Sequence, residues 1–391
     1  MRRLTLPDTT RGVVSMSVAV ACAAAVVRTV ALGGLDRWVT AGDAYTDPST
    51  VPGGISVLAG DGYDGQFFYR LALHPWRLGI GPFDGIRFDT AFRAGRIAYP
   101  ALAWLVSLGG RPALVPAALV LVNLAAIGVL AWAGSHLAVS SGMRAAWGLV
   151  LPSFVGVAFS FSRDLSEIVA AAAVFSALHF LRRDRVGPAA LALVVAVLSR
   201  EQSVLAVAAL AVGVLVTSAR AKQLGLGVAR AATVAVVPAI AFVTWQVVAA
   251  RQVGQWPALV SSDRHTSAPS SPFPTLVWRW ARESVGDEWV TFAFVALVIV
   301  VTTVVMCFVS GGLRTAWRAH PGEVLLGAVA LAVVIEFYGR TTDPSYFRQA
   351  YELSGVSWLI AWQGRPGVAH RALWVVVPLT VVAVAVRLLI V

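Results

Sequence analysis

Apolar runs close to the length of a membrane-spanning helix recur along the entire chain and set its fold class. A bilayer core about 30 Å thick needs roughly 20 apolar residues in a helix to cross it. We therefore expect an all-α, polytopic transmembrane helical bundle of about 11 crossings, forming one integral membrane domain over residues 1–391. The runs are 13–32, 112–133, 147–161, 165–181, 188–198, 204–217, 228–249, 290–309, 324–338, 351–362 and 373–391.

Composition excludes several other classes of protein. The chain is 58% hydrophobic and 13% charged, with a mean hydropathy of +0.75, which argues against a soluble protein. The net charge of +11 comes from arginines gathered in short gaps between apolar runs. That pattern is typical of membrane topology, so we expect membrane lipids and no nucleic acid as partners.

Metal and cofactor motifs are absent from the sequence. The two cysteines, Cys22 and Cys307, lie inside apolar runs, and His74 and His265 stand alone. We therefore expect no metal site and no cofactor. The chain has no P-loop, GxGxxG or GxSxG pattern, which argues against the usual ATPases, dinucleotide enzymes and serine hydrolases.

The distribution of arginine predicts the orientation in the plasma membrane. We interpret 96–108, which is short and broken by proline, as an interfacial or re-entrant helix that does not cross. With a cytoplasmic N-terminus, nearly all short basic loops then fall inside. These loops carry Arg144; Arg182, Arg183 and Arg185; Arg220 and Lys222; Arg314 and Arg318; and Arg365 and Arg371.

Two long segments fall on the predicted extracytoplasmic face. Residues 33–111 are rich in glycine, aspartate and aromatic residues, and we expect short interfacial helices within this first loop. Residues 250–289 form the second, which is rich in serine and proline and then in tryptophan, as in a flexible lid over the interface. The same face would hold the shorter turns at 162–167, 199–202 and 339–348.

The first loop contains the strongest candidate for catalysis. Asp61 and Asp64 lie three residues apart among glycines, which allow tight turns. A carboxylate in a partly dry site at the membrane edge is suited to act as a general base. The alternative is a solvated turn in which an aspartate caps the helix that follows.

A second acidic turn is predicted on the same face. Asp164 and Glu167 are spaced to share one face of a helix, beside Arg163, and charges near membrane depth indicate function. The alternative is a capping turn. Arg200 either pairs with the adjacent Glu201 or holds a phosphate, since a guanidinium binds phosphate oxygens in pairs. The same alternatives apply to Arg340 and Arg348.

Residues 63–72, Tyr-Asp-Gly-Gln-Phe-Phe-Tyr-Arg-Leu-Ala, resemble a family motif. The segment is similar to the Trp-Asp-x-x-x-Tyr-x-x-Ile-Ala pattern of PIG-V-like mannosyltransferases. It also resembles the Tyr-Asp-Gly-Gln-x-Tyr stretch of bacterial membrane proteins linked to cell-surface glycopolymers. The order of a first helix, a long acidic outer loop and further helices resembles the GT-C superfamily of integral membrane glycosyltransferases. Here a tyrosine precedes the aspartate where the first pattern has tryptophan.

The resemblance implies transfer of a sugar from a polyprenyl-phosphate donor to a glycan, lipid or protein acceptor at the extracytoplasmic face. Asp64 would be the general base, with Asp61 beside it, and Asp164 or Glu167 would orient the substrates. Arg200, Arg340 or Arg348 would hold the carrier phosphate. The further substrate-binding candidates are Tyr69, Arg70, His74 and Arg163.

Two other functions fit the same residues. A transporter or flippase for a lipid-linked or envelope substrate would also line its path with acids and arginines. Its charges would gather near the midplane, and its sequence would show an internal repeat, which is not evident here. A non-catalytic subunit of a glycopolymer assembly complex is the third possibility, and it would tolerate loss of the Asp64 carboxylate.

Overall fold

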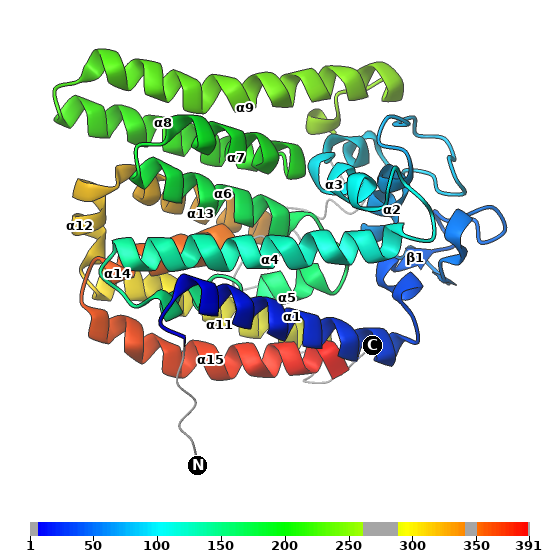
Figure 1. Ribbon diagram of the computed structural model, residues 1–391, viewed down its shortest axis with the longest axis horizontal. Helices are drawn as coiled ribbons and strands as arrows, with labels where there is room; N and C mark the ends of the chain where they lie inside the picture. Colours follow the sequence, from blue (N-terminus) through cyan, green and yellow to red (C-terminus); the bar gives the residue numbers. More distant parts are fainter. Residues whose placement is uncertain (1–6, 261–287, 341–349, 390–391) are drawn as a thin grey trace.

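The computed structural model describes residues 7–260, 288–340 and 350–389, and this part of the chain is almost entirely helical (Figure 1). Long helices lie side by side along one direction. Four of them are long and apolar enough to cross a membrane, namely α1 (Thr10–Leu32), α4 (Val115–Ser140), α8 (Ser203–Arg220) and α9 (Leu224–Val253). The expected helical membrane protein is thus confirmed in outline, whereas the count of about 11 crossings stays a prediction.

The remaining helices are shorter, bent or less apolar. The apolar part of α11 (Glu288–Val309) meets α12 (Gly312–Ala319) at 79°, and together the two make a fifth candidate span. The others are α6 (Glu167–Arg182), α7 (Val186–Ser199), α13 (Pro321–Arg340), α14 (Tyr351–Trp362) and α15 (Pro366–Leu389).

The apolar run 147–161 does not form a single helix. It is split into the 3₁₀ turn η4 (Ala145–Val150) and the short helix α5 (Val155–Phe161). Pro152 lies between them, and proline lacks the backbone donor that a continuous helix would need there. The expected continuous crossing at this position is therefore wrong.

The segment 33–111 gathers at one end of the bundle, which we call the loop end (Figure 1). Its longest helices are α2 (Gly65–Leu73) and α3 (Ala98–Val106), and β1 (Ala41–Gly42) pairs in parallel with β2 (Val57–Leu58). With nine residues, α3 is roughly 14 Å long, which is too short to cross a bilayer and agrees with the reading of 96–108. Three 3₁₀ turns complete the segment: η1 (Leu35–Val39), η2 (Pro52–Gly54) and η3 (Ala91–Gly95). A further described 3₁₀ turn, η5 (Pro257–Leu259), follows α9 and contacts η3.

The opposite end carries the short basic loops, and we call it the basic end. There Arg220 donates to the backbone carbonyl of Trp317, and the backbone N–H of Arg365 donates to the carbonyl of Ser310. The separation of loop end and basic end is what the positive-inside rule predicts for a chain that crosses repeatedly.

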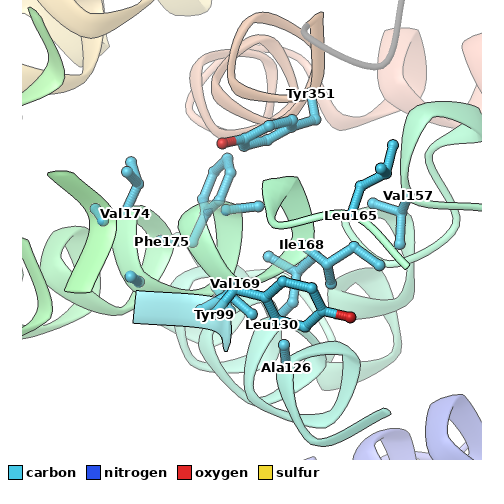
Figure 2. Close-up of a cluster of buried hydrophobic side chains, with 14 of the residues drawn as sticks. Tyr99, Ala126, Leu130, Val157, Leu165, Ile168, Val169, Val174, Phe175 and Tyr351 are labelled. Atoms are coloured by element: carbon cyan, nitrogen blue, oxygen red, sulfur yellow. The ribbon is translucent and has the colours of Figure 1, made fainter. Parts of the chain in front are cut away.

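The interior packs α4, α6 and α14 against one another (Figure 2). Phe175 of α6 points toward Tyr351 of α14, and Leu130 of α4 lines the same small cavity as these two rings. Gly355 leaves room for the Phe175 ring, because a Cβ at position 355 would overlap it. Close approach through small residues is the usual way that helices gain packing energy inside a membrane.

A buried ion pair joins two helices at the basic end. Arg182 donates from Nε and Nη2 to both carboxylate oxygens of Glu323, at 2.6 and 2.8 Å, and both side chains are at most 5% exposed. A third nitrogen, Nη1, donates to the hydroxyls of Ser140 and Ser141. Arg182 therefore connects α6, α13 and the end of α4 through one guanidinium.

Removing one partner of this pair should destabilise the protein strongly. We expect Glu323→Gln to cost about 3–5 kcal/mol, because it leaves the Arg182 charge buried without a counterion. The double change Arg182→Met with Glu323→Leu should cost less, since it removes both charges. Thermal unfolding in detergent measures both. Arg230→Gln, which removes the exposed Arg230–Asp184 pair, is the control and should cost less than about 1 kcal/mol. A double variant less stable than the single one would contradict the expectation.

Candidate functional site

Charged side chains from five separate parts of the chain meet at the loop end. They come from the start of α2, from η3, from the turn between α5 and α6, from the turn between α7 and α8, and from the first turn of α14. The charged members are Asp64, Asp89, Arg93, Arg96, Arg163, Asp164, Glu167, Arg200, Glu201 and Glu352.

Tight backbone packing places Asp64 at the start of α2. Gly60 and Gly62 adopt left-handed backbone angles, with φ of 99° and 65°, as the glycines at these positions predict. Gly65 begins α2 against the backbones of Val39 and Arg163, where a Cβ would lie 2.6 and 2.9 Å from their carbonyl oxygens. The helix can begin here only because position 65 has no side chain.

The side chain of Gln66 holds this turn in place through hydrogen bonds. It is fully buried, its Oε1 accepts from the N–H of Gly42 and the hydroxyl of Thr46, and its Nε2 donates to the carbonyl of Asp61. Three hydrogen bonds from one buried amide group fix the conformation of the loop. The sequence reading missed this anchoring role of Gln66.

Asp64 is held by an arginine and does not cap α2. Its Oδ1 accepts from Arg93 Nη1 at 2.8 Å, and no cap hydrogen bond is formed at the N-terminus of the helix. Arg93 also binds Asp89 through Nε and Nη2, at 2.8 and 2.9 Å, and lies over the ring of Phe67. The capping alternative for Asp64 is therefore wrong, and Arg93 orients its carboxylate.

Arg96 lies one 3₁₀ turn beyond Arg93 and connects the loop to the bundle. Its Nε and Nη2 donate to the two carboxylate oxygens of Glu201, at 2.9 and 2.8 Å, and Nη1 lies 3.9 Å from Glu167 Oε1. Burial opposes ionisation of Glu201, but Arg96 outweighs it and holds the pKa of that carboxyl below its ordinary value. The Glu201 carboxyl thus stays ionised beside Arg96.

Arg200 is a buried cation with unused donor groups. It is 1% exposed, its Nη2 donates to Gln202, and its Nη1 lies 3.6 Å from Glu352 Oε2. Among the described residues, Nε and Nη1 of Arg200 have no hydrogen-bond acceptor. Buried polar groups are nearly always satisfied, so these donors are suited to bind an acceptor that the described residues do not supply.

Asp164 is the most unusual residue of the site. It is fully buried and left-handed, with φ of 52°, and within the described part of the chain neither carboxylate oxygen has a hydrogen-bond partner. Burial raises the pKa of this carboxyl to about 8, with Arg28 acting in the opposite direction. Backbone strain combined with an unsatisfied carboxyl is typical of functional positions.

The two acidic turns lie against each other. Tyr63 packs on Phe159 with ring centroids 6.0 Å apart, Arg163 lies over the Tyr63 ring, and the start of α2 contacts the Arg163 carbonyl. The segment around η3 provides a second connection, because its Arg93 binds Asp64 while its Arg96 binds Glu201 and lies near Glu167. Sequence positions more than 100 residues apart therefore form one charged cluster, as the topology predicts.

Some predicted relationships differ from the structure. Asp164 and Glu167 do not share a helix face, because α6 begins only at Glu167 and Asp164 precedes it in left-handed conformation. Arg200 and Glu201 do not pair with each other; their side chains diverge toward Glu352 and Arg96. The capping alternative for the second turn is also wrong, since no side chain caps α6.

Four candidates of the first loop lie outside the charged cluster. Asp61 is exposed, Tyr69 donates to the carbonyl of Pro52, and Arg70 packs over the ring of Phe88 and donates to the carbonyl of Gly79. The Nε2 atom of His74 lies 3.5 Å from Oδ2 of Asp84. None of these contacts joins the charged cluster. Arg340 is the last residue of α13, and its side chain lies outside the described part of the chain. Arg348 and most of the proposed lid at 250–289 also lie outside it.

The sequence reading missed Asp89, Arg93, Arg96 and Glu352. A signal was available for the two arginines, because the positive-inside rule predicts few cations on the outer face. Arginines that occur there in spite of the rule need carboxylate partners, and Asp89 lies one helical turn before Arg93. Within the described part of the chain, no three His, Cys, Asp or Glu side chains are grouped to hold a metal ion.

Comparison with known proteins adds no family assignment. No protein-family model matches the chain, and no curated protein matches it significantly. The functional argument therefore rests on the geometry of the charged cluster.

The buried carboxyl of Asp164 should make stability depend on pH. In the folded protein it keeps its proton up to about pH 8, whereas the ordinary value is 3.8. The folded state binds more protons than the unfolded state between these values, so it loses stability as pH rises from about 4 to about 8. Asp164→Asn removes this loss, and asparagine tolerates the left-handed backbone. We expect the variant's melting temperature to exceed that of the wild type by several degrees at pH 9 and by little at pH 5.

Asp61→Asn, in an exposed carboxylate of the same face, is the control and should show no such trend. A difference between Asp164→Asn and the wild type that stays constant from pH 5 to pH 9 would contradict the raised pKa.

Proposed function

We propose that this protein is a GT-C-type glycosyltransferase of the plasma membrane, with its active site at the extracytoplasmic face. It would transfer a sugar from a polyprenyl-phosphate donor to a glycan, lipid or protein acceptor of the cell envelope. The observation that carries the proposal is that one short segment around η3 supplies both Arg93, which binds Asp64, and Arg96, which binds Glu201 and lies near Glu167. Such a site provides one base and several cations in a partly dry environment.

The reaction would need only proton transfer, orientation and charge neutralisation. Asp64 accepts the proton of the acceptor hydroxyl, and the acceptor oxygen forms a bond to the anomeric carbon of the sugar. The bond between that carbon and the carrier phosphate oxygen breaks, and the phosphate leaves with the electron pair. A base positioned against the hydroxyl contributes a factor of about 10²–10⁴ in rate. Attack opposite the leaving group inverts the anomeric centre.

Arg200 is the best candidate to hold the carrier phosphate. Its guanidinium is buried, and its Nε and Nη1 have no acceptor among the described residues. Two adjacent N–H groups of a guanidinium match two phosphate oxygens, and a dry site strengthens their attraction. Neutralising the phosphate lowers the barrier for its departure.

Asp164 is suited to a different role from Asp64. With its pKa raised to about 8, its carboxyl is mostly protonated at neutral pH and is able to donate a hydrogen bond to a substrate. It would orient a hydroxyl or the sugar ring while Asp64 accepts the reacting proton. Two carboxyl groups in different environments thus divide the roles of donor and base.

The transporter alternative fits the geometry less well. Its charges would gather near the midplane of the membrane and among broken helices. The cluster instead lies where the first loop meets the helix ends, at the beginnings of α2, α6 and α14. A non-catalytic subunit remains as the second candidate, and activity measurements separate it from the enzyme.

Replacing Asp64 tests the proposed base. We expect Asp64→Asn to lower sugar transfer from polyprenyl-phosphate sugars in proteoliposomes by about 10²–10⁴, while Arg93 keeps its pair with Asp89 and the fold persists. Asp61→Asn is the matched control, since it lies three residues away and is exposed. Equal transfer by wild type and Asp64→Asn would remove Asp64 as base. Solute uptake without a glycoside product would favour a transporter.

Replacing Arg200 tests the phosphate contact. Arg200→Lys keeps the charge but loses the planar guanidinium that can donate two hydrogen bonds to one phosphate. We therefore expect at least about a tenfold loss in kcat/KM for the polyprenyl-phosphate sugar. Varying donor and acceptor separately should place the effect on the donor. Arg77→Lys, on the exposed surface of the first loop, should leave the kinetics unchanged. A defect confined to the acceptor would contradict the assignment.

A further inference from the structure

A groove on the side of the bundle lies away from the charged cluster. It has a volume of about 540 Å³ and runs between the η4–α5 segment, α14 and α15, with Ile299 of α11 at its wall. Its lining is mainly apolar and includes Trp147, Phe154, Trp358 and Val377. The volume falls within the range of about 300–1,000 Å³ that small-molecule sites occupy.

The basic side chains of the groove lie at one end, while its other polar residues, Ser153, Ser354 and Thr380, are uncharged. Arg144 and His370 lie at that end, and the ring of His370 meets Trp147 with centroids 4.9 Å apart. Arg371 and Arg365 are exposed on the adjoining part of α15 and its preceding turn. These three arginines and His370 belong to the basic end, opposite the Asp64 cluster.

The length of the groove matches one leaflet of a bilayer. Along α15 it extends from His370 to Val381, a span of 12 residues whose ends are roughly 16 Å apart along the helix. Half of a hydrocarbon core about 30 Å thick is about 15 Å. A ligand in this groove would thus place its polar group at the basic end and its tail near the midplane.

We propose that this groove binds an anionic phospholipid of the cytoplasmic leaflet, with one acyl chain between η4–α5 and α15 and the phosphate beside Arg144 and His370. The position of the cations selects this occupant. A polyprenyl carrier bound for transfer would have its phosphate at the loop end, and a second copy of this chain would need no cation at the mouth of the groove. The inference does not depend on the proposed glycosyl transfer.

Arg144 has a competing partner that the phosphate would share or displace. Both Arg144 and Asp8 are largely exposed, with side-chain exposures of 65% and 68%, and Arg144 Nε donates to Asp8 Oδ1 at 2.8 Å. Exposed pairs of this kind contribute little. A headgroup phosphate, carried to the groove by its buried tail, therefore competes well for the guanidinium.

Lipid retention tests the groove directly. The wild-type protein is reconstituted with equal amounts of palmitoyl-oleoyl phosphatidylglycerol and phosphatidylcholine, extracted into mild detergent and analysed by native mass spectrometry. We expect one phosphatidylglycerol retained per chain, with about fivefold enrichment over phosphatidylcholine for each arginine that contacts the headgroup. Equal retention of both lipids, retention of a polyprenyl phosphate instead, or a dimer that excludes lipid would overturn the proposal.

A matched pair of variants on one helix locates the site. Val377 lines the groove and Val375 does not, although both are valines of α15 with exposures of 50% and 44%. Val377→Trp should fill the groove and abolish retention, whereas Val375→Trp should retain lipid like the wild type. Thr380→Trp is a second groove-filling variant in case the first unfolds. Equal retention by the filled variants and Val375→Trp would overturn the assignment.

The headgroup contact has its own control. Arg144→Gln should lower the ratio of retained phosphatidylglycerol to phosphatidylcholine about fivefold. Arg318→Gln, an exposed arginine of α12 outside the groove, should leave the ratio unchanged. An equal drop in both variants would mean that only the general charge of the basic end attracts the lipid, and it would overturn a specific site.

Discussion

The contact of Arg96 with Glu201 and Glu167 connects the parts of this molecule that would otherwise be separate. Arg96 belongs to the 33–111 segment, Glu167 begins α6, and Glu201 lies in the turn between α7 and α8. Each of these side chains would be costly to bury alone, and each is tolerated because the others neutralise it. The loop end therefore keeps its shape only while these three charges remain together, and the candidate active site is built around that requirement.

Much of the architecture could be predicted from the period and length of the apolar runs. These runs predicted a helical membrane protein, and the excess of arginine in alternate gaps predicted a bundle with two unlike ends. The limits of the method appear at 147–161, where total apolarity does not reveal that Pro152 divides the segment. Hydropathy measures how well a segment tolerates lipid, but it does not measure whether the backbone stays continuous.

Only part of the site was predictable: Arg163 and Arg200 were chosen from the sequence along with several acids, whereas Asp89, Arg93, Arg96 and Glu352 were missed. Asp64 and Asp164 could be chosen from the sequence because carboxylates near glycine turns and helix ends are conspicuous in so apolar a chain. The ion pairs of the site depend on tertiary contacts that local spacing does not reveal. Arg93 lies 29 positions from Asp64, and Arg200, in the turn after α7, meets Glu352 of α14. The expectation that Asp164 and Glu167 share a helix face assumed that both residues are helical. Asp164 instead has a left-handed backbone conformation and precedes α6.

The absence of a side chain at Gly65 has a mechanical consequence. Backbone meets backbone where α2 begins beside Val39 and Arg163, so no rotamer change can widen or narrow that contact. A side chain at position 65 would therefore push the two acidic turns apart, and the distance between the Asp64 turn and the Arg163 turn is set by this glycine.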